Sequence, residues 1–121
     1  MIVKELMRTA IVIEKNISLS KAAKIIVSKN INSIIFMKKN KIEGIITKED
    51  LLKNFGKKIN VSKIMTKSLI AIKSTEDIEE AKELMRKNKI NVLPVMEKGK
   101  LAGIVAGKDL LIAQKEGFLF E

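Results

Sequence analysis

The sequence predicts an α/β fold of the α+β kind, with two β-α-β-β-α repeats that are related by pseudo-two-fold symmetry and packed through their sheets. Three observations predict it. The chain matches itself at a fixed offset, its hydrophobic period changes in the same order in both copies, and each copy is too short to cover both faces of a sheet with its own helices. With 121 residues, 46% of them hydrophobic and 31% charged, the chain has the size of a single globular domain.

The repeat is visible in the sequence itself. Residues 13–52 align without a gap on residues 72–111, and twelve of the forty pairs are identical. Within the stretches GIITKED and GIVAGKD, Gly44 matches Gly103 and Asp50 matches Asp109. Upstream the offset changes by one residue, so one copy carries a slip before its first strand. We expect residues 1–58 to form the first repeat and residues 59–121 the second, together making one compact domain.

Each repeat begins with a short strand and a helix. Apolar runs at residues 10–13 and 69–72 predict the strands. In the second copy Ser74 or Thr75 can cap the helix, and an apolar stripe at helical spacing follows. The stripes are Leu19, Ala22, Ala23 and Ile26 in the first copy, and Ile78, Ala81, Leu84 and Met85 in the second.

Two more strands and a closing helix complete each repeat. Asn40 and Gly99 suit the turns between these strands because they tolerate positive φ. The predicted strands are 33–37, 42–46, 92–96 and 101–105, and the closing helices are 48–55 and 108–115.

Composition excludes several classes of function. The chain has no Cys and no His, which removes disulfides, thiolate chemistry and the commonest metal ligand and general base. We therefore expect no catalytic residues, no metal and no enzymatic activity. No apolar run is long enough to cross a membrane and the start does not resemble a signal peptide, so a cytoplasmic location without a membrane partner is the expectation.

The charge is positive and uneven. There are 24 basic and 14 acidic residues, a net charge of +10, and residues 1–60 alone carry 13 basic against 5 acidic groups. An anion should be attracted mainly to the first half. A solvated lysine-rich surface is the simpler explanation of the charge. A nucleic-acid-binding protein is the alternative function, although the sequence has no helix-turn-helix signature, zinc site or interleaved aromatic residues.

The stretch GIITKED has both a structural and a functional interpretation. Thr47 at the N-cap and Asp50 three residues later form a capping box, which alone accounts for both residues. In the second copy Ala106 and Gly107 have lost the cap while Asp109 remains. A carboxylate there offers two acceptor oxygens to two adjacent hydroxyls, such as those of a ribose, and the free N–H groups of the helix could receive phosphate.

The order, spacing and duplication of these motifs resemble a tandem pair of cystathionine-β-synthase (CBS) domains, also called a Bateman module. The residues that carry the resemblance are 64–72, 89–96 and 100–111 with their first-repeat equivalents, and it extends from about residue 3 to about residue 115. It implies a small stand-alone regulatory module without a catalytic cofactor. The regulatory ligand would be AMP, ADP, ATP or S-adenosylmethionine, bound in two clefts between the repeats. The resemblance also implies a disc-like homodimer and a regulated protein that senses the bound ligand.

The resemblance assigns residues to each cleft. Asp50 would hold the ribose and Thr47 the ribose or phosphate, whereas Ala106 replaces the usual hydroxyl in the second copy and makes the cleft of Asp109 the weaker one. Aliphatic walls would hold adenine, because the chain has no Trp or Tyr. The stronger cleft would comprise Ile45, Thr47, Asp50, Leu69, Ile70, Ile90 and Asn91, and the weaker one Ile11, Val12, Ile31, Asn32, Ile104 and Asp109. Candidates for a phosphate are Lys48, Lys63, Lys108 and Arg8.

Overall fold

The computed structural model describes residues 1–67 and 70–120, with side chains up to residue 113. The chain forms two compact units, which are described separately. Unit 1 comprises Met1–Ala10 and Ile70–Glu121, and unit 2 comprises Ile11–Leu69. The first ten residues therefore fold with the strands of the second repeat. The repeat boundaries at residues 1–58 and 59–121 stay a prediction of the sequence.

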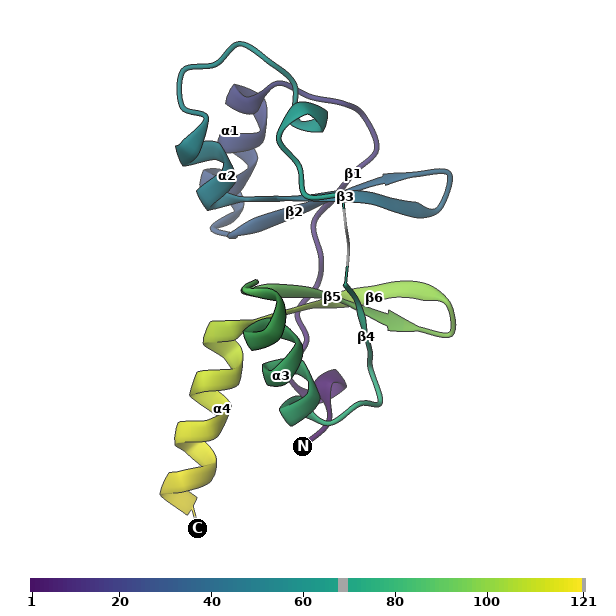
Figure 1. The fold of residues 1–121 in the computed structure, drawn as a ribbon, viewed down its shortest axis with the longest axis vertical. Helices are drawn as coiled ribbons and strands as arrows, with labels where there is room; N and C mark the ends of the chain where they lie inside the picture. Colours follow the sequence, from purple (N-terminus) through teal and green to yellow (C-terminus); the bar gives the residue numbers. More distant parts are fainter. Residues whose placement is uncertain (68–69, 121) are drawn as a thin grey trace. The chain divides into compact units, whose positions relative to one another are not determined.

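Unit 2 is a three-stranded sheet with two helices on one face (Figure 1). The sheet order is β1-β2-β3, with β1 parallel to β2 and β3 antiparallel to it. Its elements are β1 (Val12–Ile13), α1 (Leu19–Lys29), β2 (Ser33–Lys38), β3 (Lys41–Thr47), α2 (Lys48–Lys53) and the 3₁₀ turn η2 (Val61–Lys63).

Unit 1 repeats this arrangement, with sheet order β4-β5-β6 and the same strand directions. Its elements are the 3₁₀ turn η1 (Val3–Glu5), β4 (Ile72–Lys73), α3 (Ile78–Asn88), β5 (Val92–Glu97), β6 (Lys100–Ala106) and α4 (Gly107–Phe120). Two β-α-β-β-α repeats in a mixed α/β fold are thus confirmed. The predicted first strands are only two residues long in the structure.

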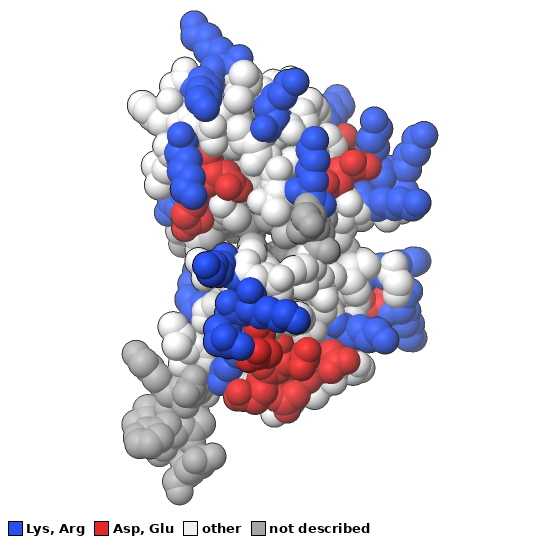
Figure 2. Space-filling model, in the orientation of Figure 1, with Lys and Arg blue, Asp and Glu red and all other residues white. Residues whose placement is uncertain are grey.

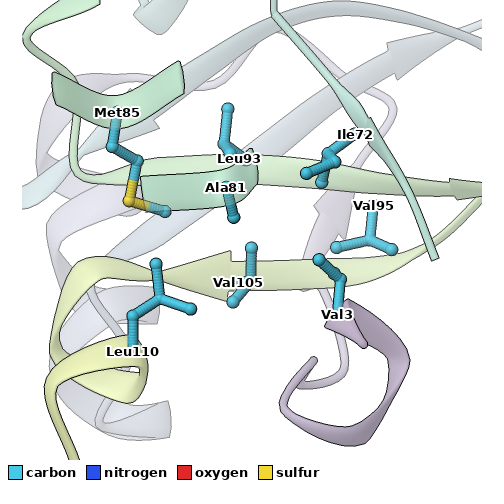
Figure 3. Close-up of a cluster of buried hydrophobic side chains, with 8 residues drawn as sticks. All are labelled: Val3, Ile72, Ala81, Met85, Leu93, Val95, Val105 and Leu110. Atoms are coloured by element: carbon cyan, nitrogen blue, oxygen red, sulfur yellow. The ribbon is translucent and has the colours of Figure 1, made fainter. Parts of the chain in front are cut away.

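Each unit has its own core between the sheet and the helices. In unit 1, Leu93 and Val95 of β5 and Val105 of β6 are fully buried against α3 and α4 (Figure 3). Burying such a side chain contributes about 1.5–3 kcal/mol relative to leaving it in water. Val3 of η1 belongs to the same cluster, which ties the start of the chain to this core. In unit 2 the corresponding cluster is Leu19, Ala22, Ile26, Ile34, Phe36, Ile46 and Val61.

The turns between the antiparallel strands are two residues long. Asn40 and Gly99 have φ of 63° and 76°, as predicted, and the residues before them, Lys39 and Lys98, also have positive φ. Positive φ at both central positions is the mark of a type I′ turn, whose twist matches the flanking strands. A β-bulge in each hairpin shifts the strand register at equivalent positions.

The predicted cap of the second-repeat helix is wrong. Asp77, and not Ser74 or Thr75, caps α3 by accepting a hydrogen bond from the N–H of Glu79 at 2.8 Å. Ser74 is buried and its N–H still bonds to the strand β5, so the chain has not yet turned into the helix at that residue. The repeat alignment could have found the cap, because Asp77 aligns with Ser18, which caps α1.

The identical glycines Gly44 and Gly103 allow a close crossing of the chain over the sheet. In unit 1 the N–H and C=O of Arg8 bond to Ile104 at 2.8 and 2.9 Å, and a Cβ on Gly103 would lie 2.5 Å from the carbonyl oxygen of Arg8. In unit 2, Thr66 and Ile45 make the same pair of bonds. There a Cβ on Gly44 would instead meet the side chain of Met65 at 2.6 Å.

We predict that Gly103→Ala destabilises the protein more than Gly44→Ala. The first change pushes against backbone that holds two hydrogen bonds, at a cost of about 2–3 kcal/mol, whereas the second displaces a flexible methionine at a cost of about 1 kcal/mol. Urea denaturation measures both. Gly107→Ala is the matched control, because a Cβ on Gly107 would lie 3.8 Å from the nearest atoms of Asn91 and Met85. This change should alter stability little. Equal losses for the two glycines would contradict this explanation.

Candidate functional site

The strand-to-helix turn between β3 and α2 forms the predicted capping box. The N–H of Thr47 donates to Oδ2 of Asp50 at 2.8 Å, and Oγ1 of Thr47 accepts from the N–H of Asp50 at 3.2 Å. Within the described residues, Oδ1 of Asp50 forms no hydrogen bond or ion pair. The half-buried carboxylate is therefore fixed through one oxygen and presents the other as a free acceptor.

The equivalent turn between β6 and α4 differs. Oδ2 of Asp109 accepts from the N–H of Ala106 at 3.3 Å, which is the part of the capping box that needs no side chain at the N-cap. Oδ1 accepts from Nη2 of Arg8 at 2.6 Å. The Asp109 side chain is only 5% exposed, whereas that of Arg8 is 59% exposed. Both oxygens of this carboxylate are thus engaged.

This geometry weakens one argument made from the sequence. The retention of Asp109 beside the lost cap pointed to a ligand, but Asp109 still binds the N–H of Ala106 and gains the guanidinium of Arg8. A structural role is therefore sufficient to explain Asp109. Of the two turn carboxylates, that of Asp50 keeps one oxygen without a hydrogen bond or ion pair among the described residues.

The paired asparagines Asn32 and Asn91 lie beside the two turns. The carbonyl of Asn32 accepts from the N–H of Lys48 at 2.9 Å, and that of Asn91 accepts from the N–H of Gly107 at 2.8 Å. These bonds use backbone atoms, and both side chains are exposed. Their amide groups are available to a ligand.

The remaining predicted residues mostly serve the fold of their own unit. Ile31 is partly buried against the core of unit 2, and Ile70 and Ile90 against that of unit 1. The carbonyl of Ile11 accepts a bond from β2, and Val12 lies in β1. Leu69 lies outside the described residues.

The structure gathers the predicted residues into one group in each unit. Ile45, Thr47, Asp50 and Asn32 surround the turn of unit 2, and Ile104, Asp109 and Asn91 surround that of unit 1. Each predicted cleft combines residues of both units. That combination stays a prediction.

Sequence reasoning missed the role of Arg8. It considered this residue only as a phosphate ligand, whereas the guanidinium binds Asp109 within the same unit. The signal was present, because at the offset of 58 Arg8 aligns with Thr66, so a cation stands in one copy where the other has a hydroxyl. Lys48, Lys63 and Lys108 are exposed.

The segment that carries Arg8 is held to unit 1 by a second ion pair. Lys4 Nζ lies 3.1 Å from Oε1 of Glu97, and the Ser74 hydroxyl donates to the same oxygen at 3.1 Å. These bonds, that of Lys4 first, lower the pKa of Glu97 below its usual value. The backbone of Arg8 itself is held by its two hydrogen bonds to Ile104.

Two kinds of site find no support among the described residues. Within residues 1–67 and 70–113, whose side chains are described, no group of three or more acidic side chains is placed to hold a metal ion. In the same part of the chain no helix has the length and apolar character that a membrane span requires. Helix α2 is only six residues long, so its dipole gives little support to the predicted phosphate contact at its N-terminus.

The fold and its duplicated turns define the class: a tandem pair of small α/β repeats with a carboxylate at each strand-to-helix turn. The family model for the CBS domain matches residues 3–57 and 61–116. The chain therefore belongs to the CBS domain family, and it contains two such domains.

Known proteins agree with this assignment. The CBS domain pair of protein MJ0100, in a crystal structure with 5′-methylthioadenosine and S-adenosyl-L-methionine, matches 98% of this chain and 97% of that chain, with a TM-score of 0.85 and 30% identity. The CBS domain-containing protein YhcV of Bacillus subtilis is 27% identical over 118 residues, which cover 93% of this chain and 84% of that protein.

Several relatives are enzymes, and this chain matches only part of them. Inosine-5′-monophosphate dehydrogenase of Thermoplasma acidophilum is 36% identical over 96 residues, 78% of this chain but only 19% of the enzyme. The chain spans about a fifth of the length of such relatives.

Proposed function

We propose that the chain is a regulatory module that binds an adenosine-type ligand, with Asp50 as the main contact to the ribose. The observation that carries the proposal is the free Oδ1 of Asp50, on a carboxylate already fixed by the N–H of Thr47. A charged acceptor at a fixed position forms strong hydrogen bonds with hydroxyl donors. The second oxygen, Oδ2, keeps a lone pair for the neighbouring hydroxyl of the diol.

The ligand class follows from the relatives and from charge. The MJ0100 pair was crystallised with 5′-methylthioadenosine and S-adenosyl-L-methionine, which share the adenosine group. Unit 2 carries 13 basic and 4 acidic residues, net +9, whereas unit 1 carries 11 and 10, net +1. An anion is therefore attracted to the unit of Asp50. Among adenosine compounds, this charge favours the phosphorylated ones: AMP, ADP or ATP.

The sequence also predicts which residues complete the cleft of Asp50. The other repeat would contribute an apolar wall and polar groups, from Ile70, Ile90 and Asn91. A regulated protein would respond to the ligand-bound state. Ligand binding would shift the equilibrium between conformations and would not drive a reaction. The cytoplasmic location expected from the sequence stays a prediction.

Nucleic-acid binding is the second candidate, and the charge of unit 2 favours it. On the face shown in Figure 2, basic side chains stand over much of the part that holds α1 and α2, while acidic side chains gather on unit 1. Acidic side chains are nevertheless interspersed on unit 2, and the chain has neither Trp nor Tyr to stack on bases.

We predict that AMP or ATP raises the melting temperature of the wild type and that Asp50→Asn removes most of this shift. A ligand at a hundred times its dissociation constant adds about 2.7 kcal/mol, or roughly 10 °C for a domain of this size. Asp109→Asn should reduce the shift less, because Arg8 already occupies that carboxylate. Glu49→Gln, an exposed carboxylate beside Asp50, is the matched control and should keep the full shift.

Two results would oppose the proposal. If no adenosine compound shifts the melting temperature, adenosine sensing is wrong. If an oligonucleotide binds with an affinity that falls steeply with salt and is unchanged by Asp50→Asn, the nucleic-acid alternative is favoured.

We also propose that the chain self-associates through unit 2, where the resemblance implied a homodimer. Helices α1 and α2 and the residues after α2 border an open groove of about 860 Å³. Val27, Leu52 and Phe55 on its walls are 77%, 68% and 89% exposed. Large apolar side chains with this exposure are favourable contacts for a second copy.

We expect the double variant Leu52→Ser and Phe55→Ser to shift sedimentation toward the monomer, because it removes two large exposed apolar side chains of the groove, including Phe55, the most exposed of the three. Neither residue belongs to the core cluster of unit 2, so folding should be retained. Leu111→Ser, which removes an apolar side chain 62% exposed on α4, is the control. An unchanged distribution of species in the double variant would exclude this interface.

A further inference from the structure

The two repeats differ at one position that decides whether their carboxylates are free. Arg8 and Thr66 are equivalent by alignment and by structure, since each pairs through two backbone hydrogen bonds with the isoleucine after the glycine that both repeats share. The Arg8 side chain reaches Asp109 at 2.6 Å. The Thr66 side chain is exposed and makes no hydrogen bond to Asp50.

We propose that Arg8 is a built-in competitor that occupies Asp109 and makes the turn of unit 1 selective for ligands with an anionic group. A neutral nucleoside offers hydroxyls to Asp109 but has nothing to draw the guanidinium away. A phosphate or carboxylate on the ligand can take over the guanidinium, since planar guanidinium groups bind such anions through two parallel hydrogen bonds. The carboxylate of Asp109 is then free to accept hydrogen bonds from the hydroxyls of the ligand.

The geometry supports a side chain that changes partner without disturbing the fold. The backbone of Arg8 is fixed to Ile104, and its segment is anchored by Lys4 and Val3. The Arg8 side chain is 59% exposed, so water or an anion can reach it, although Asp109 is 5% exposed. Displacement of the guanidinium therefore requires only rotation of one side chain.

A purely structural ion pair is the competing explanation, and the repeat argues against it. Asp50 holds the same bond to the N-cap N–H as Asp109 without any cation at the equivalent of Arg8. The turn therefore forms without this guanidinium. The effect of Arg8 is to occupy Oδ1 of Asp109, whose equivalent in Asp50 is free among the described residues.

This inference rests on the proposed function. Its test therefore measures binding at the turn of Asp109 separately from binding at the turn of Asp50. Asp50→Asn is used as the background, which leaves Asp109 as the one remaining carboxylate of the aligned pair. In this background we expect AMP to bind at the turn of Asp109, more weakly than the wild type binds it, and adenosine to bind more weakly than AMP. Adding Arg8→Thr, which copies Thr66, should strengthen adenosine binding about tenfold to a hundredfold, as expected when a site blocked 90–99% of the time is opened. The same change should weaken AMP binding. Isothermal titration calorimetry measures both ligands.

A reciprocal variant keeps the test valid if Arg8→Thr does not fold. Thr66→Arg in the wild-type background places a guanidinium at the equivalent position beside Asp50, and Thr66 is exposed. It should weaken adenosine binding at Asp50 by at least about tenfold and spare AMP. Arg86→Thr removes the other arginine, which pairs with Glu83 on α3, and is the control.

The outcomes distinguish the two proposals. If wild type and variants bind neither adenosine nor AMP, the proposed function fails, and this inference fails with it. If the wild type binds but the ratio of adenosine to AMP affinity is unchanged by both Arg8→Thr and Thr66→Arg, the role of Arg8 alone is overturned. A change of that ratio in opposite directions at the two sites supports it.

Discussion

The crossing of the chain over the last strand of each sheet is the constraint on which the rest of the structure depends. In unit 1 two hydrogen bonds join Arg8 to Ile104, and in unit 2 two join Thr66 to Ile45. The crossing requires the absence of a side chain at Gly103, where a Cβ would meet the backbone of Arg8, whereas a Cβ at Gly44 would displace the side chain of Met65. The crossing also places Arg8 beside Asp109 and Thr66 at the equivalent position in unit 2. The backbone arrangement that stabilises each sheet therefore determines whether the turn carboxylate is paired with a cation.

Much of the fold could be predicted from the sequence because the information is local and duplicated. Short apolar runs predicted the hairpin strands, and Asn40 and Gly99 marked their turns. The N-cap at Asp77 was missed because Ser74 and Thr75 are equally good caps by residue type. Only the hydrogen bond of Ser74 to β5 shows that the chain is still extended there.

The candidate site was harder to predict, because its difference between repeats depends on a contact far apart in sequence. The capping box of Thr47 and Asp50 spans three residues and was found. The ion pair of Arg8 with Asp109 joins residues that are 101 positions apart in the sequence. The two residue types alone do not predict this contact. Comparison of Arg8 with Thr66 was the available clue, and its meaning became clear only with the geometry of both turns.

Adenosine-type ligands are proposed to bind at the turn of Asp50. The most direct test is a titration of the isotope-labelled protein with AMP, followed by amide NMR. We expect saturable chemical-shift changes that are largest at residues 45–50 and that are lost at these residues in Asp50→Asn. Shifts confined to scattered exposed lysines, without saturation and without change in Asp50→Asn, would contradict it.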